Sequence, residues 1–433
     1  MRDLIQGVSW LALDKIIRMG LGVLVSVAVA RKLGVSNFGE LNYVITFLSL
    51  LGSISLLGLH EVVVRELIRA QNDTKKKRDI ISGATAIVTG STLLISIVVS
   101  TLGIFNVPAC NANFGCNMAI ICALCLQTHT IFIMWFEAHR NFNTLTKITV
   151  TSYLVSLSIK VLFLLMDFGL IAMIFAYAYD SITILVFFAI YLLKFYKLGD
   201  SFFSLNYCLM KDLVMRSYPL AFASIAIIVA MRVDVIMLQN LSGPRNVGLY
   251  SAATRVSELW FFLIPIILTV AFNQLEMAKE NYGLFKIIAG YLYGVMIYLS
   301  LLFALLFYWG SNFIIEVLYG KEFLASAIIV KIHCFCGILV GVNSVFQKIL
   351  LVKGREKMIL VIHVVSAVSN IGINYLLIPS FGAYGAAIAT IVSYAFGGIV
   401  GLLLFEPKFH LAAIYFGLIK TPKLVINKMA ELK

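Results

Sequence analysis

Charged residues are scarce in this sequence of 433 residues. Asp, Glu, Lys and Arg together account for 13% of it, and apolar residues account for 61%. Soluble domains carry roughly 25% charged residues, because polar groups have to cover their surface. The shortage of charge therefore excludes a soluble globular protein and indicates a chain that lies largely in a lipid bilayer.

The sequence also lacks the motifs that carry covalent chemistry or bind metal ions. It has no glycine-rich phosphate-binding loop, no His-x-x-x-His pair and no nucleophile with a suitably spaced base. Two pairs of closely spaced cysteines lie in apolar stretches, which favours small core residues over metal ligands; they are Cys122 with Cys125 and Cys334 with Cys336. We therefore expect no catalytic residue, no bound metal and no cofactor, and the protein is not expected to be an enzyme.

Cys110 and Cys116 share a short uncharged loop, residues 106–116. In an oxidising compartment they could form a disulfide. Their spacing would close only a small ring, so two free thiols are the favoured interpretation.

About twelve apolar stretches follow one another, each near the roughly 20 residues that a helix needs to cross a bilayer. They lie near residues 9–33, 39–64, 80–105, 117–137, 146–166, 170–194, 214–241, 247–273, 284–310, 324–350, 358–378 and 383–405. The first stretch has no small-residue cleavage site, so we expect a retained helix and not a signal peptide. The sequence therefore predicts an all-α polytopic membrane protein with twelve transmembrane helices.

The net charge of +13 is distributed in a way that argues against nucleic-acid binding. Lys and Arg gather after the second, sixth and tenth stretches and in the tail, whereas the loops 106–116 and 378–382 carry no charge. Short loops rich in Lys and Arg stay in the cytoplasm. Both termini are therefore predicted to be cytoplasmic.

Two halves of the chain resemble each other. Glycine and asparagine residues recur at an offset of 209 residues, and a Phe-Gly pair recurs at an offset of 213. The matched residues are Gly34, Asn37 and Gly39 with Gly243, Asn246 and Gly248, and Phe168–Gly169 with Phe381–Gly382. Six helices plus six give two parallel repeats, and transporters built in this way bind substrate between the halves.

The repeat gives four predicted segments. An N-terminal six-helix lobe covers residues 1–195, a cytoplasmic connector covers 196–216, and a C-terminal six-helix lobe covers 217–407. Residues 408–433 alternate apolar runs with lysine, which is typical of an amphipathic helix on the inner leaflet.

Ionisable side chains inside the predicted spans are the strongest functional signal, because such groups are costly in lipid and usually line a cavity or pair with one another. The cations are Lys15, Arg18, Lys160, Arg232, Arg255 and Lys331, and the acids are Asp14, Glu61, Asp180, Asp234 and Glu258.

Some of these charges have simple structural explanations. Asp14 with Arg18, and Arg255 with Glu258, are spaced to pair on one helix face. Lys160 has no acid on its own helix, so a partner such as Asp180 or a bound anion is expected. A structural ion-pair network and a basic internal cavity both remain open.

Other polar and helix-breaking residues have structural interpretations too. Asn370 and Asn374 are one turn apart, which favours contacts between helices over ligand binding. Pro219 and Pro265 interrupt predicted spans and are either hinges or tolerated packing features.

Four segments resemble a known family. They are ARKLGVSNFGELNY (30–43), RVDVIMLQNLSGPRNVGLYSAATRVSEL (232–259), LYGKEF (318–323) and NIGINYLLIPSFGAYGAAIAT (370–390). Together they resemble Wzx-type flippases of the polysaccharide transport family. That family belongs to the multidrug/oligosaccharidyl-lipid/polysaccharide exporter superfamily.

The resemblance implies a two-lobed, V-shaped, MATE-like transporter of a bacterial inner membrane. Its substrate would be a polyprenyl-pyrophosphate-linked oligosaccharide repeat unit, of the O-antigen or capsule type. Partners would include membrane lipids, a polysaccharide polymerase and a chain-length regulator. A cation-coupled multidrug exporter of the same superfamily is the main alternative, and a membrane glycan polymerase or ligase is a weaker one.

An anionic pyrophosphate would suit a basic cavity. The predicted substrate-binding residues are Arg18, Lys160, Arg232, Arg255 and Lys331. The acids predicted to couple transport to protons or sodium, or to balance charge, are Asp180, Asp234 and Glu258.

Overall fold

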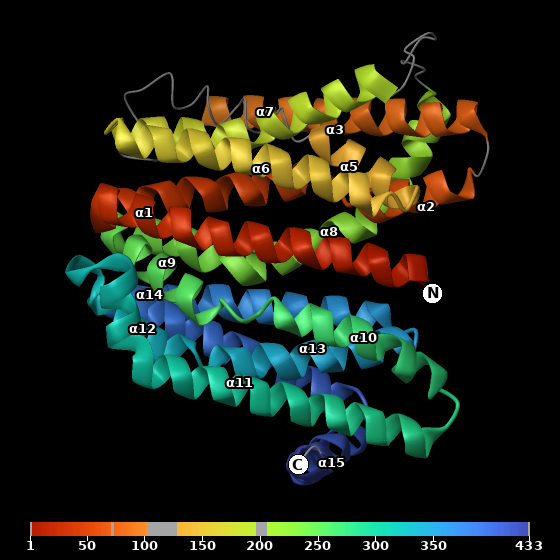
Figure 1. The fold of residues 1–433 in the computed structure, drawn as a ribbon, viewed down its shortest axis with the longest axis vertical. Helices are drawn as coiled ribbons and strands as arrows, with labels where there is room; N and C mark the ends of the chain where they lie inside the picture. The colour runs from red at the N-terminus through yellow and green to blue at the C-terminus, as the bar shows by residue number, and fades with distance from the viewer. Residues whose placement is uncertain (1, 71–72, 103–127, 196–205, 432–433) are drawn as a thin grey trace. The chain divides into compact units, whose positions relative to one another are not determined.

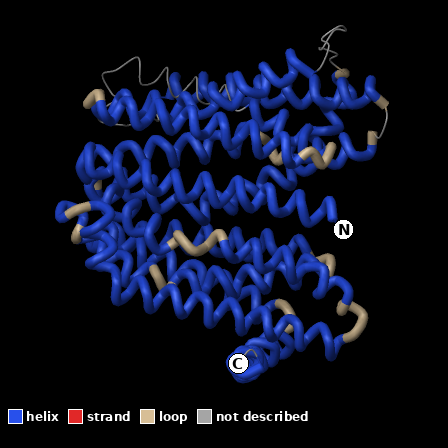
Figure 2. Tube along the Cα trace, viewed as in Figure 1, coloured by secondary structure: helices blue, strands red, loops and turns tan. Residues whose placement is uncertain are grey.

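The computed structural model describes residues 2–70, 73–102, 128–195 and 206–431, and within these ranges it contains helices and no β-strand (Figures 1 and 2). The chain divides into two compact units, Met1–Ile228 and Val229–Lys433, with the boundary inside helix α8. The all-α prediction is confirmed.

Among its described residues, unit 1 contains six helices and the first part of a seventh. They are α1 (Arg2–Ser55), α2 (Leu59–Arg69), α3 (Thr74–Leu102), α5 (His129–Ala138), α6 (Phe142–Leu165), α7 (Gly169–Phe195) and α8 (Tyr207–Ser242), which continues into unit 2. Unit 2 adds α9 (Pro244–Ser257), α10 (Leu263–Met277), α11 (Tyr282–Tyr319), a 3-10 turn (Lys321–Phe323), α12 (Ala325–His333), α13 (Cys336–Val352), α14 (Glu356–Leu404) and α15 (Pro407–Glu431).

Every predicted span overlaps one or more of these helices, although the count of twelve stays a prediction. Eight helical stretches among the described residues are long and apolar enough to cross a membrane. Three predicted spans are each broken into two helices, at residues 56–58, 258–262 and 334–335. Residues 103–127, which hold Cys110, Cys116, Cys122 and Cys125, lie outside the described part of the chain.

The same glycine turn occurs in each half of the chain. Gly34 has φ 74° and ψ 173°, and Gly243 has φ 83° and ψ 171°. Only glycine adopts this region readily. Asn37 and Asn246 each donate from the side-chain amide to the carbonyl four residues earlier, at 3.1 and 3.2 Å. The predicted repeat therefore has a structural counterpart at this turn.

Gly382, with φ 54°, reverses the chain inside α14 in a comparable way. It separates the two predicted spans at the end of the chain. α1 and α14 each consist of two helices that meet at a kink with non-helical backbone angles, at Gly34 and Gly382, so each of them contains a predicted pair of spans.

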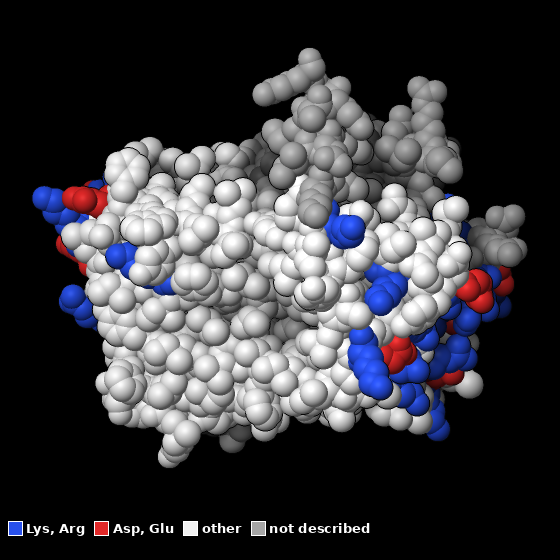
Figure 3. Space-filling model, turned by 90° about the horizontal axis from the view of Figure 1, so that it is seen from below, with Lys and Arg blue, Asp and Glu red and all other residues white. Residues whose placement is uncertain are grey.

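The surface in Figure 3 shows where charge lies on one face of the molecule. Lys, Arg, Asp and Glu gather toward two opposite edges, and a broad band between them is almost free of charge. Large apolar side chains such as Leu94, Leu302 and Leu403 are exposed on the long helices. Exposed apolar surface between charged ends fits the hydrocarbon core of a bilayer, and the chain is a multi-pass membrane protein.

α2 packs through one face because its apolar residues recur at helical spacing. Leu59, Val62, Val63 and Leu67 are fully buried. They meet residues of α3, α5 and α8 in one apolar cluster, which includes Ile80, Ala84, Val88, Ile131, Met134 and Leu213.

The first part of α8 lies very close to the start of α2. Gly58 has φ 66°, and a Cβ atom at this position would lie 2.8 Å from the carbonyl oxygen of Ser217. Gly58 therefore marks a true break between α1 and α2. The break lets the α8 backbone approach.

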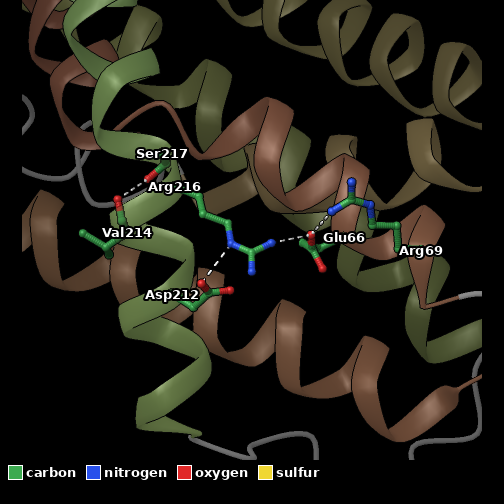
Figure 4. Close-up of polar contacts among 6 residues, drawn as sticks. All are labelled: Glu66, Arg69, Asp212, Val214, Arg216 and Ser217. Carbon is green, nitrogen blue, oxygen red and sulfur yellow. Dashed lines mark hydrogen bonds and ion pairs between the residues drawn. The ribbon is translucent and has the colours of Figure 1, made fainter.

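Ion pairs also connect α2 and α8 (Figure 4). Glu66 is buried, and one of its carboxylate oxygens accepts from Arg69 at 2.9 Å and from Arg216 at 3.1 Å. Arg216 also donates to Asp212 at 2.9 Å. Because Arg216 on α8 pairs with the buried carboxylate of Glu66 on α2, α8 is held to α2 at this end of unit 1.

α15 packs along α11 through small residues. Gly290 and Gly294 on α11 face Ala413, Gly417 and Thr421 on α15 so closely that a Cβ atom on either glycine would collide with the other helix. Small residues four apart allow such close backbone approach in membrane helices. The predicted interfacial position of the tail stays a prediction, but the tail is firmly attached to unit 2.

Charged and aromatic side chains connect the start of α15 to the end of α13. Lys353 pairs with Glu406 and lies 4.4 Å from the ring centroid of Phe409. This hydrogen bond lowers the pKa of Glu406, and burial lowers the pKa of His410 to about 4. His410 is therefore neutral at pH 7 and hydrogen-bonds Tyr293 at 2.9 Å.

Candidate functional site

Each unit holds its own cluster of the predicted residues. In unit 1, the Lys160 ammonium on α6 lies 2.7 Å from an Asp180 carboxylate oxygen on α7. Ser156 donates a hydrogen bond to the same carboxylate, and the Tyr177 ring centroid lies 3.9 Å from the ammonium. The predicted pairing of Lys160 with Asp180 is confirmed.

The two ends of this ion pair differ in exposure. The Lys160 side chain is 3% exposed, whereas the Asp180 side chain is 33% exposed. The ammonium is thus held inside the unit, against an aromatic ring that favours a cation. The carboxylate end is the more exposed part of the pair.

Arg18 lies on α1, half-buried. The Tyr153 hydroxyl of α6 donates to the Arg18 backbone carbonyl at 3.1 Å, which fixes α1 against the helix that carries Lys160. The side chains of Asp14 and Lys15 lie outside the described residues, so the predicted pairing of Asp14 with Arg18 stays untested.

The second cluster begins on α8 in unit 2. Arg232 is exposed, whereas Asp234 is buried, as expected for residues two apart on a helix. Asp234 accepts from the Tyr250 hydroxyl and from the backbone N–H of Val235 at 2.8 Å. The buried carboxylate is therefore bound by donors from two helices.

This cluster extends to α14 and α12 through side chains that the sequence did not single out. The Tyr250 hydroxyl also contacts the Thr390 hydroxyl at 3.2 Å. Ser257 lies 2.8 Å from the Nδ1 atom of His333, and the Tyr250 and His333 rings meet edge to face. Four helices thus meet in one buried polar network.

Glu258, at the end of α9, is shared between two arginines. Electrostatically it interacts with Arg232 more strongly than with Arg255. The pairing of Arg255 with Glu258 predicted from their spacing is therefore only part of the arrangement. Arg232 also interacts electrostatically with the buried Asp234, more weakly than with Glu258.

Lys331 and the nearby cysteines complete the predicted set. The Lys331 ammonium on α12 lies 5.8 Å from the ring centroid of Tyr308. Cys334 and Cys336 are buried free thiols, in agreement with their interpretation as core residues. In the part of the chain that the structure describes, no group of three His, Cys, Asp or Glu side chains is placed to hold a metal ion.

Polar helix-packing residues behave as the sequence predicted. Asn374 donates to Asn370 at 2.8 Å, and Asn370 donates to Ser393 at 3.1 Å. The bond from Asn370 to Ser393 joins the two arms of α14. Pro265, in contrast, lies in the first turn of α10, where a proline interrupts little.

Comparison with known proteins identifies the family. A family model described as "Polysaccharide biosynthesis protein" matches residues 4–273, and a second model, MatE, matches residues 219–376. The chain belongs to the polysaccharide biosynthesis protein family.

Solved structures share the fold of this family member at low sequence identity. An inward-facing multidrug resistance MATE family transporter of the MOP superfamily is 13% identical, with a TM-score of 0.75 over 94% of this chain and 98% of that one. The lipid II flippase MurJ, in an inward closed conformation, is 16% identical, with a TM-score of 0.68 over 96% of this chain and 92% of that one. The polysaccharide biosynthesis family member therefore has the fold of MOP superfamily transporters.

One curated relative matches over a short region. An uncharacterized membrane protein of Methanocaldococcus jannaschii is 33% identical over 114 residues, which cover 26% of this chain and 22% of that protein. The match therefore spans less than a quarter of the relative's length.

Proposed function

We propose that this protein is a flippase that moves polyprenyl-pyrophosphate-linked oligosaccharide repeat units, of the O-antigen or capsule type, from the cytoplasmic to the outer leaflet. The observation that supports it most is Arg232, which has an exposed side chain on α8, a helix apolar enough to cross a membrane, and which attracts Glu258 electrostatically. Placing a charged side chain at the centre of a membrane helix costs a free energy of roughly 2.5–3.5 kcal/mol. Binding of an anionic substrate would offset this cost. Family membership and the flippase fold of MurJ agree with this role.

In the proposed mechanism, the substrate phosphates exchange with the carboxylates that hold the cations of the empty protein. Arg232, Arg255 and Lys331 would bind phosphate from unit 2, and Arg18 and Lys160 from unit 1. Guanidinium groups hold phosphate oxygens with two parallel hydrogen bonds.

The acids are proposed to neutralise the cations of the empty protein or to couple this exchange to an ion gradient. Asp180 and Glu258 neutralise nearby cations when no substrate is bound. Asp234, held by Tyr250, is the proposed site where a proton or sodium ion couples transport to an ion gradient. No covalent bond is made or broken, so the protein acts as a transporter and not as an enzyme.

We propose that the protein lies in a bacterial inner membrane with both termini in the cytoplasm. The lobes would be residues 1–195 and 217–407, joined by 196–216, with a cytoplasmic tail at 408–433. The carrier lipid, a polymerase and a chain-length regulator would be its partners.

Thiol labelling tests the orientation. In a variant whose seven cysteines are replaced by alanine, we expect a membrane-impermeant maleimide to label Glu322→Cys from outside intact cells. Lys76→Cys should be labelled only after the cells are opened. Both positions are exposed, so accessibility alone does not distinguish them. Labelling of position 76 alone from outside would reverse the proposed orientation.

Replacing Arg232 with glutamine tests the transport function. We expect surface glycan to fall by at least about tenfold, since a charge-assisted phosphate contact worth about 1.5–3 kcal/mol is lost. Lipid-linked precursor should accumulate on the cytoplasmic leaflet while protein abundance is unchanged. Arg245→Gln is the control, because Arg245 is an exposed arginine at the start of α9. Normal surface glycan in the Arg232 variant would remove this residue from the substrate path.

A cation-coupled multidrug exporter is the second candidate, because the MATE family transporter shares the fold with a TM-score of 0.75. Such an exporter predicts that deletion of the gene raises drug sensitivity and leaves the glycan unchanged. A flippase predicts the opposite pattern.

A further inference from the structure

A cavity in unit 2 lies apart from the residues of the two charged clusters. It has a volume of about 330 Å³ and is lined by one face of α10, one face of α13 and the first turn of α14. The lining residues are Ile264, Pro265, Leu268, Thr269, Ser344, Gln347, Lys348, Leu351 and Ile359. Their spacing along α10 and α13 follows helical periodicity, so two helix faces form its walls.

Lys348 is the charged residue of this lining, and no carboxylate is among the lining side chains. Its side chain is half-buried, and its ammonium lies 4.9 Å from the ring centroid of Phe272. An aromatic ring attracts a cation more weakly than an anionic group does. The ammonium is therefore available to a negatively charged ligand in the cavity.

Three neutral polar side chains line the same cavity as Lys348. The Thr269 hydroxyl donates to the Pro265 carbonyl, and the Ser344 hydroxyl donates to the Val340 carbonyl, each at 2.7 Å. The Gln347 side chain lies 3.3 Å from the Nε2 atom of His363. Hydroxyl hydrogens rotate to suit a partner, so both hydroxyls can turn toward a ligand oxygen.

The remaining walls are apolar. Ile264 and Leu268 come from α10, Leu351 from α13 and Ile359 from α14. A ligand that fits the whole cavity needs an anionic, hydrogen-bonding head and a hydrocarbon part. An inorganic anion would leave the apolar walls unused, and an uncharged hydrocarbon would leave Lys348 without a counter-charge.

We propose that this cavity binds the phosphate group of a lipid, with Lys348 paired to the phosphate and the first carbons of the chain against the apolar walls. This inference rests on the proposed transport of a phosphate-linked lipid and adds Lys348 as a binding residue. An isoprenoid phosphate and a membrane phospholipid share the chemistry that the cavity recognises.

Binding of farnesyl phosphate to the purified full-length protein in detergent tests the proposal. We expect farnesyl phosphate to bind at least about tenfold more tightly than farnesol or inorganic phosphate. Lys348→Gln should weaken farnesyl phosphate binding about tenfold, and Lys348→Arg should retain it. Lys279→Gln is the matched control in the same unit, since Lys279 is an exposed lysine 3.7 Å from Glu276.

The comparison ligands decide what the cavity recognises. Equal binding of farnesol and farnesyl phosphate would overturn the proposal, as would unchanged binding in Lys348→Gln. Displacement by phosphatidylglycerol would support the proposal and assign the site to bulk membrane lipid, and failure of phosphatidylglycerol to displace would support it and assign the site to an isoprenoid phosphate. If Lys348 proves dispensable while Arg232→Gln still blocks glycan export, this inference fails and the proposed transport function stands.

Discussion

Replacing Lys160 with methionine will abolish glycan export and lower the free energy of unfolding by about 3 kcal/mol. Asp180 would lose the ammonium that lies 2.7 Å from its carboxylate and would face an apolar side chain instead. Export of surface glycan and thermal unfolding of the purified protein measure the two effects. Lys147→Met is the control, because Lys147 is an exposed lysine on the same helix.

A double variant separates the structural and functional roles of this pair. Lys160→Met with Asp180→Asn removes both charges, and such a neutral pair costs far less than a single unpaired charge. We expect the double variant to regain stability while export stays lost, because the phosphate-binding cation is missing. Recovery of export in the double variant would show that the pair serves the fold alone.

Replacing Gly417 with valine will detach α15 from α11 and cost about 3 kcal/mol of stability. The Gly417 backbone lies directly against the Gly290 carbonyl, so a side chain cannot be added without moving a helix. Thermal unfolding and faster proteolysis of the tail will report the change.

Gly372→Ala is the matched control for this substitution. Gly372 is also helical, but a Cβ atom there meets nothing within 4 Å. Alanine favours helix over glycine by about 1 kcal/mol, so this variant should be as stable as the native protein or slightly more stable. A stable Gly417→Val protein with a protected tail would contradict the close packing of α11 and α15.

The helices could be predicted because long apolar stretches in lipid must satisfy their own backbone hydrogen bonds. The pairing of Lys160 with Asp180 could be predicted because the two opposite charges lie on consecutive helices joined by a short turn. The breaks at residues 258–262 and 334–335 contain no glycine, unlike the break at residues 56–58, and they were not predicted.

The buried network around Asp234 could not be predicted. Tyr250, Thr390 and Ser257 are ordinary hydroxyl residues in apolar helices, and they become functional candidates only when α9, α12 and α14 pack together. The attachment of α15 was also missed. The lysines of the tail suggested a membrane surface, whereas the decisive residues are glycines whose role depends on a second helix.

The turns at Gly34 and Gly243 reverse the chain with almost no residues between consecutive helices. Such a turn leaves little exposed peptide for an antibody, a protease or another binding protein to recognise. Reagents that reach this end of either unit would therefore have to recognise side chains at helix ends, and epitope tags inserted here would disturb folding far more than tags placed at the chain termini.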